Sequence, residues 1–527
     1  MAFITVPTLG IGGLNKEVDP MFLGRLTSQG VLDLQFADGR NTDFDSLTVK
    51  KRKGLASFFS GIAGIPMLVQ DFVDVNNKRW MVVVTTTKIY TFDEVALILT
   101  DRTPTGYSGS LVTPPRATTF QFKHYVVNGT GFWYWDAVAA TYLALPAGSP
   151  TTAKDVFGFG QHLMLFNVVS SGGVSDVYKS AWSGFLDGTI WTSGDALSAD
   201  IVDGADAVAG GAAFGRVAVL LKTDSIYSIT PIPAPFFYEF DPRVIGIGCI
   251  ATATIQVIPG IGITFLGRDD WYLYDTISVQ PIVGNRGESV RKDILKNMSA
   301  QNIGAAFTLR SFRDQQLLLF IPSIAWTFTA PTYNVYVYNW RYRTLAQYDY
   351  SNIPGGVSGG GEHFYSVGRT WNQSTYGFNV SPYRFNDQSG AQTAPALIAA
   401  GATSGKIYRL PTTPQYTDDG NAYDSWVQTG LTDFGNPWPV RKMVNRVHIL
   451  FIPQSAGAIN VFLSKSDDGE TQALIGPNAE QNFTPLSVGA WFQATGVHLG
   501  VKIDDASGVN YWEAKSCLFE VEPGGER

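Results

Sequence analysis

Five nine-residue windows of this chain follow one template, in which polar turn residues lead into an aromatic-rich strand. They read TTTKIYTFD (85–93), NGTGFWYWD (128–136), KTDSIYSIT (222–230), GRDDWYLYD (267–275) and TSGKIYRLP (403–411). The sixth position is aromatic in all five: Tyr90, Trp133, Tyr227, Tyr272 and Tyr408. A weaker copy lies at 173–181 (GVSDVYKSA) and a further candidate at 331–339 (PTYNVYVYN). Such repetition indicates one structural unit used several times.

The spacing of the windows indicates the kind of unit. The first starts fall at 85, 128, 173, 222 and 267, in steps of 43, 45, 49 and 45 residues. A four-stranded propeller blade takes roughly 40–50 residues. Apolar strands such as MVVV (81–84) and RVAVLL (216–221) precede the windows, which is typical of hairpins. We therefore predict an all-β fold with a β-propeller of six or seven blades, each of about 45 residues. The alternative interpretation, an unrelated all-β protein with aromatic hairpins, stays open.

Alternation within the strand predicts where the aromatic rings lie. Side chains two positions apart share one face of a strand. Trp133 and Trp135 should therefore lie on the same packed face between blades, as should Tyr90 with Phe92 and Tyr272 with Tyr274.

The chain of 527 residues, 45% of them hydrophobic, is long enough for two or three domains. We predict an N-terminal segment at 1–60, a propeller at 61–415 and a small β-sandwich at 416–527. The Gly-, Ser-, Asn- and Gln-rich stretch 350–400 is predicted to be a long loop or insertion within the propeller. The late steps to 331 and 403 measure 64 and 72 residues, so the spacing leaves the blade number open.

Two stretches bear on targeting and membrane insertion. The N-terminus has no basic residue before Lys16 and is interrupted by Pro7, which argues against a signal peptide. Residues 244–267 carry no charge over 24 positions. Their β-branched residues and the Pro259-Gly260 pair favour two buried strands over a membrane helix. We expect the protein to be made in a cytoplasm and not to insert stably into a membrane. Two cysteines, Cys249 and Cys517, are too few for a disulfide framework.

The clearest helix candidate is 287–299. An apolar stripe of Val290, Ile294, Leu295 and Met298 is expected to face the core. Four basic residues around it, Arg286, Arg291, Lys292 and Lys296, are expected to be solvated.

One segment matches a catalytic pattern. Residues 356–360 read GVSGG, which places Ser358 in a Gly-x-Ser-x-Gly motif close to His363. That motif is functional only on a strained turn between a strand and a helix. No helix pattern follows, so a flexible glycine-rich loop is predicted.

Carboxylates and histidines were considered as metal ligands. SKSDDGET (464–471) resembles the Asp-box hairpin of sialidases at Asp467 and Gly469 but has Lys465 in place of its serine. The clusters Asp418/Asp419 and Asp467/Asp468/Glu470 lack the spacing of a calcium loop. The five histidines, His124, His162, His363, His448 and His498, show no metal spacing. We predict no catalytic, cofactor-binding or metal site and no enzyme activity, although carboxylate pairs that meet only in space stay open.

The strongest charge cluster is Lys50-Lys51-Arg52-Lys53. A nucleic-acid patch, a surface turn or a protein contact would each account for this cluster. The net charge of −7 argues against tight non-specific DNA binding, which rests on neutralising phosphates.

The order of several motifs suggests a family. These motifs are GGLNKEVDP (12–20), the turn residues Gly39 and Asn41, Arg52-Lys53-Gly54, FGFGQHLMLFN (157–167), SAWSGFLDGTIW (180–191), LGRDDWYLYDTISVQPI (266–282), the turn GKIY (405–408) and GNPWPVRKMVNRVHI (435–449). Together they resemble the tail nozzle proteins of short-tailed bacteriophages, also called tail tubular protein B. Lys53 departs from the Arg-Pro-Gly found in many members.

The resemblance implies a structural virion protein made in the host bacterial cytoplasm. It would assemble as a homohexameric ring below the adaptor ring (tail tubular protein A-like) and the portal, and contact tail fibres or spikes. Double-stranded DNA would be retained and then pass without sequence-specific binding during genome ejection. Six copies with a net charge of −7 each would carry a total charge of −42, and this negative charge suits a conduit for DNA. We expect residues 1–60 and the sandwich to make the ring and adaptor contacts.

Two other classes of protein are compatible with these features. A carbohydrate-binding or carbohydrate-active propeller is suggested by aromatic residues near turns, such as Trp133 and Trp271, because aromatic faces stack on sugars. The other class is a different tail or baseplate component.

Overall fold

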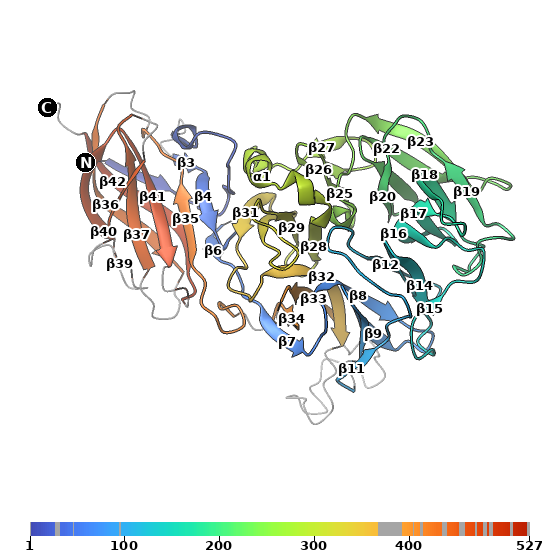
Figure 1. Cartoon of the computed structure of the whole chain (residues 1–527). Coiled ribbons are helices and arrows are strands. Elements are labelled where there is room, and N and C mark those ends of the chain that lie inside the picture. Colours follow the sequence, from blue (N-terminus) through green and yellow to red (C-terminus); the bar gives the residue numbers. More distant parts are fainter. Residues whose placement is uncertain are drawn as a thin grey trace, which may run out of the picture.

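The computed structural model describes residues 2–523 apart from 27–31, 46, 94–95, 367–392, 404, 412–414, 435–439, 453–458, 469–471, 478–481, 484–488, 506–507 and 509. The fold is nearly all-β and has two modules, a β-propeller and a β-sandwich, which lie side by side in Figure 1. The predicted fold class is confirmed.

Five sheets of the propeller contain four antiparallel strands each, consecutive in sequence. Their strands are β12 (Arg116–Phe120), β13 (Lys123–Asn128), β14 (Gly131–Trp135) and β15 (Leu143–Ala144); β16 (Thr152–Phe159), β17 (His162–Val169), β18 (Ser175–Trp182) and β19 (Leu197–Asp200); β20 (Val208–Phe214), β21 (Val217–Lys222), β22 (Ser225–Pro231) and β23 (Tyr238–Ile245); β24 (Gln256–Ile258), β25 (Gly262–Leu266), β26 (Trp271–Tyr274) and β27 (Val279–Pro281); β28 (Phe307–Ser311), β29 (Gln316–Pro322), β30 (Tyr333–Asn339) and β31 (Thr344–Tyr348).

A sixth propeller sheet has eight strands and joins the two ends of the propeller sequence. Its order is β11 (Ile98–Asp101), β10 (Ile89–Asp93), β9 (Arg79–Thr85), β8 (Pro66–Val73), β32 (Val357–Ser366), β33 (Thr393–Gly401), β34 (Lys406–Arg409) and β7 (Ala56–Ser60). A parallel bridge between Leu68 and Gly360 connects its halves. Because the halves share one sheet, the number of blades stays a prediction.

The first strands of these units surround a common centre. Each first strand contacts the next, in the order β8, β12, β16, β20, β24, β28 and β32, and β32 in turn contacts β8. The ring is closed by sequence-distant strands, because β7 from the N-terminal part pairs with β34 on the last half-sheet. Closure of this kind leaves no broad open edge between the first and last units.

The repeated template marks the third strand of each unit. Its aromatic residues lie in β10, β14, β18, β22, β26, β30 and β34, and six of the seven are buried: Tyr90, Trp133, Tyr227, Tyr272, Tyr336 and Tyr408. The paired rings also face neighbouring units as predicted. Trp133 and Trp135 share a cluster with Phe72 and Trp80 of the preceding sheet.

The sandwich is built from both ends of the chain. One of its sheets has the order β40 (Ala490–Gly496), β36 (Lys442–Phe451), β42 (Glu513–Pro523), β6 (Val49–Lys51) and β5 (Thr42–Phe44), with β1 (Ala2–Val6) also on β42. The other has the order β38 (Ala473–Ile475), β37 (Ile459–Ser466), β41 (His498–Asp505), β35 (Ser425–Thr429) and β4 (Phe36–Arg40), with β39 (Asn482–Phe483) beside β37. A small pair is formed by β2 (Gly24–Leu26) and β3 (Leu32–Leu34).

The predicted domain boundaries therefore need correction. Residues 1–60 do not form a separate segment, since β1, β4, β5 and β6 pair with strands of the C-terminal region and β7 belongs to the propeller. The predicted unit 416–527 lacks the N-terminal strands that complete both of its sheets. Strand pairing across more than 400 residues leaves no local signal in the sequence.

The glycine-rich stretch 350–400 is also corrected in part. It contains β32 and β33, two strands of the propeller, while residues 367–392 lie outside the described residues. The glycines permit a close approach to β8. A Cβ at Gly359 would lie 2.0 Å from the carbonyl oxygen of Met67, and one at Gly361 would lie 1.9 Å from that of Val69. Glycine here serves backbone packing between strands.

The predictions for the helix candidate 287–299 and for the uncharged stretch 244–267 have different outcomes. The helix α1 (Arg291–Asn297) is shorter than predicted; Val290 and Ile294 are buried, but Leu295 is 41% exposed and does not belong to the packed stripe. Three short 3-10 helices are η1 (Pro20–Phe22), η2 (Thr252–Thr254) and η3 (Ala300–Ala305). The uncharged stretch 244–267 contains β24 and β25 joined by a turn at Gly260, as predicted. In the part of the chain that the structure describes, no helix has the length and apolar character needed to span a bilayer.

Candidate functional site: the module junction and the axial cavity

The sandwich is joined to the propeller along the edge strand β31. The backbone N–H of Leu14 donates to the carbonyl of Leu345 over 2.9 Å, and that of Asn41 donates to the carbonyl of Gln347 over 2.8 Å. The Thr344 hydroxyl donates to the carbonyl of Phe44 over 2.9 Å. These bonds satisfy groups that a sheet edge would otherwise leave exposed.

The N-terminal motif GGLNKEVDP takes part in this junction. The N–H of Gly13 donates to Glu288 Oε1 over 3.1 Å, and the N–H of Lys16 donates to the carbonyl of Ser289 over 2.8 Å. A Cβ at Gly13 would lie 2.8 Å from the nitrogen of Leu345, so glycine permits the close approach.

A continuous hydrophobic core spans both modules. A single cluster of buried residues includes Phe36 and Val444 of the sandwich together with Leu319, Tyr336 and Leu345 of the propeller. Core continuity of this kind opposes relative motion of the modules, which a small polar interface would permit.

The basic run lies inside this junction, and its four cations each pair with an aspartate. Lys50 pairs with Asp45, Lys51 with Asp505, Arg52 with Asp418 and Lys53 with Asp314. The side chains of Lys51 and Arg52 have no exposed surface. A nucleic-acid patch on this run is therefore wrong, and the surface-turn interpretation is wrong for these two residues.

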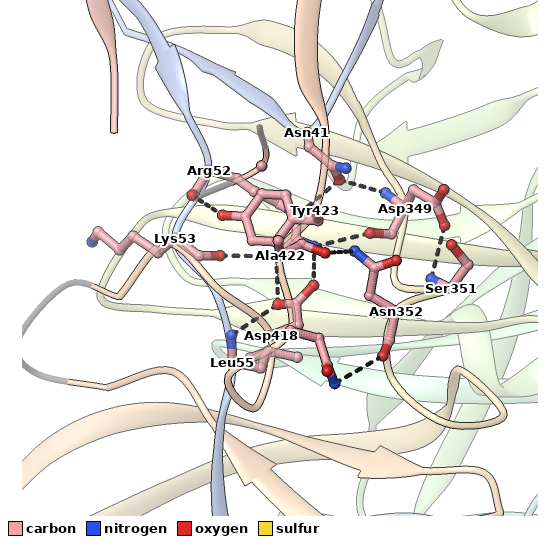
Figure 2. A network of polar contacts seen from close by, with 12 residues as sticks. Asn41, Arg52, Lys53, Leu55, Asp349, Ser351, Asn352, Asp418, Ala422 and Tyr423 are labelled. Atoms are coloured by element: carbon pink, nitrogen blue, oxygen red, sulfur yellow. Dashed lines mark hydrogen bonds and ion pairs between the residues drawn. The ribbon is translucent and has the colours of Figure 1, made fainter. Parts of the chain in front are cut away.

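Arg52 is the centre of the network shown in Figure 2. Its Nη1 and Nη2 donate to the two carboxylate oxygens of Asp418, over 3.0 and 2.5 Å. Nε donates to Asn41 Oδ1 over 2.8 Å, and Nη2 also reaches the carbonyl of Asp349 over 2.9 Å. The carbonyl of Lys53 accepts a further bond from Nη1, over 3.0 Å. The planar guanidinium is suited to such a fixed set of acceptors.

Aromatic rings complete the surroundings of the guanidinium. Its central carbon lies 3.9 Å from the ring centroid of Tyr423 and 4.3 Å from that of Tyr350. The Tyr423 hydroxyl donates to the carbonyl of Arg52 over 2.5 Å. Burial opposes the charge of Arg52, but Asp418 more than offsets it, so the pKa of Arg52 is raised. Arg52 stays charged and links β6, the propeller loop after β31 and the segment before β35.

A second buried ion pair lies beside it. Lys51 Nζ donates to Asp505 Oδ2 over 3.1 Å and to the carbonyl of Gly508 over 2.7 Å. Burial lowers the pKa of Lys51, against the attraction of Asp505. Nearby, a cavity of about 130 Å³ is lined by Asp43, Lys53 and Asp314 among others. Burial raises the pKa of the Asp43 carboxyl, while hydrogen bonds from Tyr348 and Gln316 act in the opposite direction.

The first strands of the propeller line a central cavity of about 400 Å³, which we call the axial cavity. Its lining residues come from β8, β12, β16, β20, β24, β28 and β32 and include small residues such as Gly211 and Gly361. A second cavity of about 270 Å³, which we call the entrance cavity, shares Pro114 with it and is lined by Lys154, Asn128 and Asn167. The sequence contained no motif for this site. Its polar residues are recognisable only once the first strands are known to converge.

The Gly-x-Ser-x-Gly segment is not a nucleophile elbow. Ser358 lies within β32, and its hydroxyl is bonded to the carbonyl oxygens of Pro66 and Ala400, over 2.6 and 3.3 Å. His363 lies five positions further along the same strand and pairs with Asp71 over 2.7 Å. The flexible loop predicted for this segment is wrong, because Val357–Ser366 forms β32.

The acidic residues considered for calcium have other partners. Asp418 binds Arg52, Asp419 pairs with Lys406 over 2.7 Å, and Asp467 pairs with Arg441 over 3.2 Å. Gly469 and Glu470 lie outside the described residues. Among the described residues no group of three or more His, Cys, Asp or Glu side chains is placed to hold a metal ion.

The remaining histidines and the cysteines are considered by their burial. His124, His162 and His498 are buried at separate places, and Cys249 and Cys517 are buried free thiols. Trp133 and Trp271, which suggested sugar stacking, are 6% and 1% exposed. These two rings therefore pack in the core and offer no face to a glycan.

Comparison with known proteins gives fold-level similarity only. No family model matches the chain, and no curated protein matches it. Similar solved structures include Raptor from Chaetomium thermophilum, at 12% identity and a TM-score of 0.38, covering 68% of this chain and 29% of that one. YCF48 from Cyanidioschyzon merolae is similar at 8% identity and a TM-score of 0.35, covering 68% and 98%. U3-55K is similar at 10% identity and a TM-score of 0.38, again covering 68% and 98%.

Proposed function

We propose that this chain is a structural building block of a short-tailed phage particle, the subunit of the distal tail tube that retains and then conducts the DNA genome. The motif order described above suggests the class. The observation that carries the proposal is the junction: a continuous core, backbone bonds along β31 and the buried Arg52–Asp418 pair fix the sandwich to the propeller.

The physical link is mechanical. A ring that holds pressurised DNA must keep its subunits in a fixed shape, and modules joined by a flexible linker would move relative to each other. In this chain the N-terminal strands belong to both modules. Pulling the two modules apart would therefore expose the core that they share. The net charge of −7 would also limit adhesion of DNA to the subunits.

The first test is the copy number of the chain in purified particles of the phage that encodes it. Quantitative mass spectrometry against the major capsid protein should give about six copies per particle, the number that a homohexameric ring requires. Electron microscopy of the same particles should then locate the density at the distal tail. Absence of the chain from particles would contradict the proposal.

A further inference from the structure

The axial cavity carries hydrogen-bond donors that no group of the described chain uses. Arg116 of β12 lines it and is partly exposed. Nε of Arg116 donates to Asp155 Oδ1 over 2.9 Å. In the described part of the chain, that bond is the only polar contact of its guanidinium, so Nη1 and Nη2 are open to a ligand.

Asp155 fixes the guanidinium without lining the cavity. Its side chain is 1% exposed, and its Oδ2 accepts the N–H of Gly211 over 2.9 Å. Oδ1 also accepts the N–H of Val156 over 2.9 Å. With both oxygens held by the backbone, Asp155 is a rigid anchor for Arg116.

Gln70 of β8 contributes a second set of donors. The Tyr142 hydroxyl lies 2.8 Å from His124 Nδ1, and His124 Nε2 lies 3.2 Å from Gln70 Oε1. Burial lowers the pKa of His124 to about 3, so its ring is neutral. Because Gln70 Oε1 can only accept, this geometry assigns the ring proton to Nε2, and the Tyr142 hydroxyl then donates to Nδ1. This relay occupies the amide oxygen of Gln70 and leaves its NH₂ group as a donor at the cavity.

Thr118 adds a hydroxyl on the same face of β12 as Arg116, two positions further along. It lines the cavity, and within the described residues its hydroxyl has no hydrogen-bond partner.

Three of the four charged residues that line the two cavities are basic. Charged residues lining the axial cavity are Arg116, Arg310 and Glu362, and Lys154 lines the entrance cavity. Arg310 and Glu362 neutralise each other through bonds of 3.0 and 3.2 Å, and the N–H of Phe312 donates to the other oxygen of Glu362 over 2.6 Å. Arg116 is paired with Asp155, but this counter-ion lies behind the lining surface, so the cavity meets the guanidinium donors and not the carboxylate.

We propose that the axial cavity is a binding site for a small oxyanion, a ligand with a carboxylate or phosphate group held by Arg116, Gln70 and Thr118. The guanidinium fork matches the oxygens of either group. A volume of about 400 Å³ accommodates a small molecule and excludes a nucleic-acid duplex. Charge-assisted hydrogen bonds from the guanidinium are stronger to an oxyanion than to the neutral hydroxyls of a sugar, which favours an oxyanion. This inference does not depend on the proposed tail function.

The test is calorimetric titration of the full chain at constant ionic strength with inorganic phosphate, with citrate and with glucose. We expect saturable binding of phosphate or citrate and none of glucose, and the stronger of the two anions identifies the group. Arg116→Gln should weaken that binding about tenfold or more, since it removes a charge-assisted contact. The matched control is Arg216→Gln at an exposed turn, which changes the net charge equally and should bind as the unmodified chain does.

Two milder variants guard against a folding defect in Arg116→Gln. Thr118→Val keeps the side-chain shape and should weaken anion binding about threefold or more by removing one neutral donor. Lys154→Gln removes the charge that lines the second cavity and should weaken anion binding less than Arg116→Gln does. Thermal unfolding without ligand monitors the fold of each variant. Equal anion affinity for the unmodified chain and for the Arg116 and Thr118 variants would overturn the proposal. Binding of glucose alone, or no binding of either anion up to about 0.1 M, would overturn it as well.

Discussion

At the scale of single residues, the buried Arg52 decides how firmly the two modules are joined. Its charge is removed from water and is balanced by the bidentate contact to Asp418 and by acceptors from two other segments, Asn41 and Asp349. A buried pair of this kind is not by itself a large source of stability. Removing one partner, however, leaves the other charge buried without compensation.

We predict that Arg52→Ala lowers the free energy of unfolding by about 3–5 kcal/mol, because Asp418 stays buried without its partner. Denaturant unfolding of the purified chain measures the change. Arg441→Ala is the matched control, since the pair of Arg441 with Asp467 is 57% and 42% exposed and should contribute almost nothing. Equal effects of the two substitutions would contradict the central place of Arg52 in the junction.

Asp270 gives a prediction about pH. It precedes β26, its Oδ1 accepts the N–H of Trp271 over 2.8 Å, and burial raises its pKa to about 6. A raised native pKa means that the unfolded chain releases this proton first as the pH increases. The contribution of Asp270 to stability is therefore fully present below about pH 4 and is lost as the pH rises to about 6.

Asp270→Asn should remove this loss while retaining an acceptor for Trp271. At pH 7 we expect the variant to be more stable than the unmodified chain by roughly 1 kcal/mol, after allowing for solvent screening. At pH 3.5 or so the two should be equally stable, since both side chains are then uncharged. Thermal unfolding at both pH values measures this, and an equal difference at the two would sink the explanation.

At the scale of elements, β7 closes the propeller from outside the repeat region. Phe59 of β7 stacks on Phe92 of β10 with centroids 4.8 Å apart, so the strand is held by side chains of the first half-sheet as well as by its pairing with β34. The first and last units therefore depend on one short N-terminal strand.

We predict that Phe59→Ala lowers stability by about 2 kcal/mol, less than for a fully buried phenylalanine because Phe59 is only partly buried. Amide hydrogen exchange in β34 should accelerate, since its outer partner becomes easier to detach. Val75→Ala, at a loop position that is 63% exposed, is the control and should change neither quantity. Unchanged exchange in β34 would mean that β7 is not what closes the sheet.

At the scale of the whole molecule, the proposed ring raises the question of which module contacts neighbouring copies. The sandwich sheet formed by β40, β36 and β42 carries Leu450 and Trp491, which are 57% and 44% exposed. The expectation from the sequence places ring and adaptor contacts on this module. Deleting the C-terminal region would not test it, because the N-terminal strands would lose their partners.

A single surface charge is a sharper test. Leu450→Glu should prevent incorporation into particles while leaving the thermal transition of the isolated chain unchanged, because an exposed residue contributes little to folding but a charge disfavours an apolar contact. Leu197→Glu on β19 of the propeller, at 44% exposure, is the matched control and should incorporate normally. The reverse pattern, scored by complementation and particle composition, would assign the ring contact to the propeller.

The sequence by itself determined the repeat and what it builds. Near-constant spacing and alternation suffice to predict a propeller, because hairpins and packed faces are local consequences of side-chain order. Tyr90, Trp133, Tyr272 and Tyr408 lie in the strands and on the buried faces where that order puts them. The absence of a helix after Ser358 was likewise enough to argue against a nucleophile elbow.

The tertiary structure alone decided the rest. Lys51 and Arg52 read as a surface cluster in sequence, and only their pairing with Asp505 and Asp418, more than 350 residues away, buries them. The sandwich needs strands from both ends, and the axial cavity needs Gln70 and Arg116 from different units to meet at one centre. A chain records its local periodicity directly, whereas contacts between distant segments depend on how complete sheets pack, which no short window of residues contains.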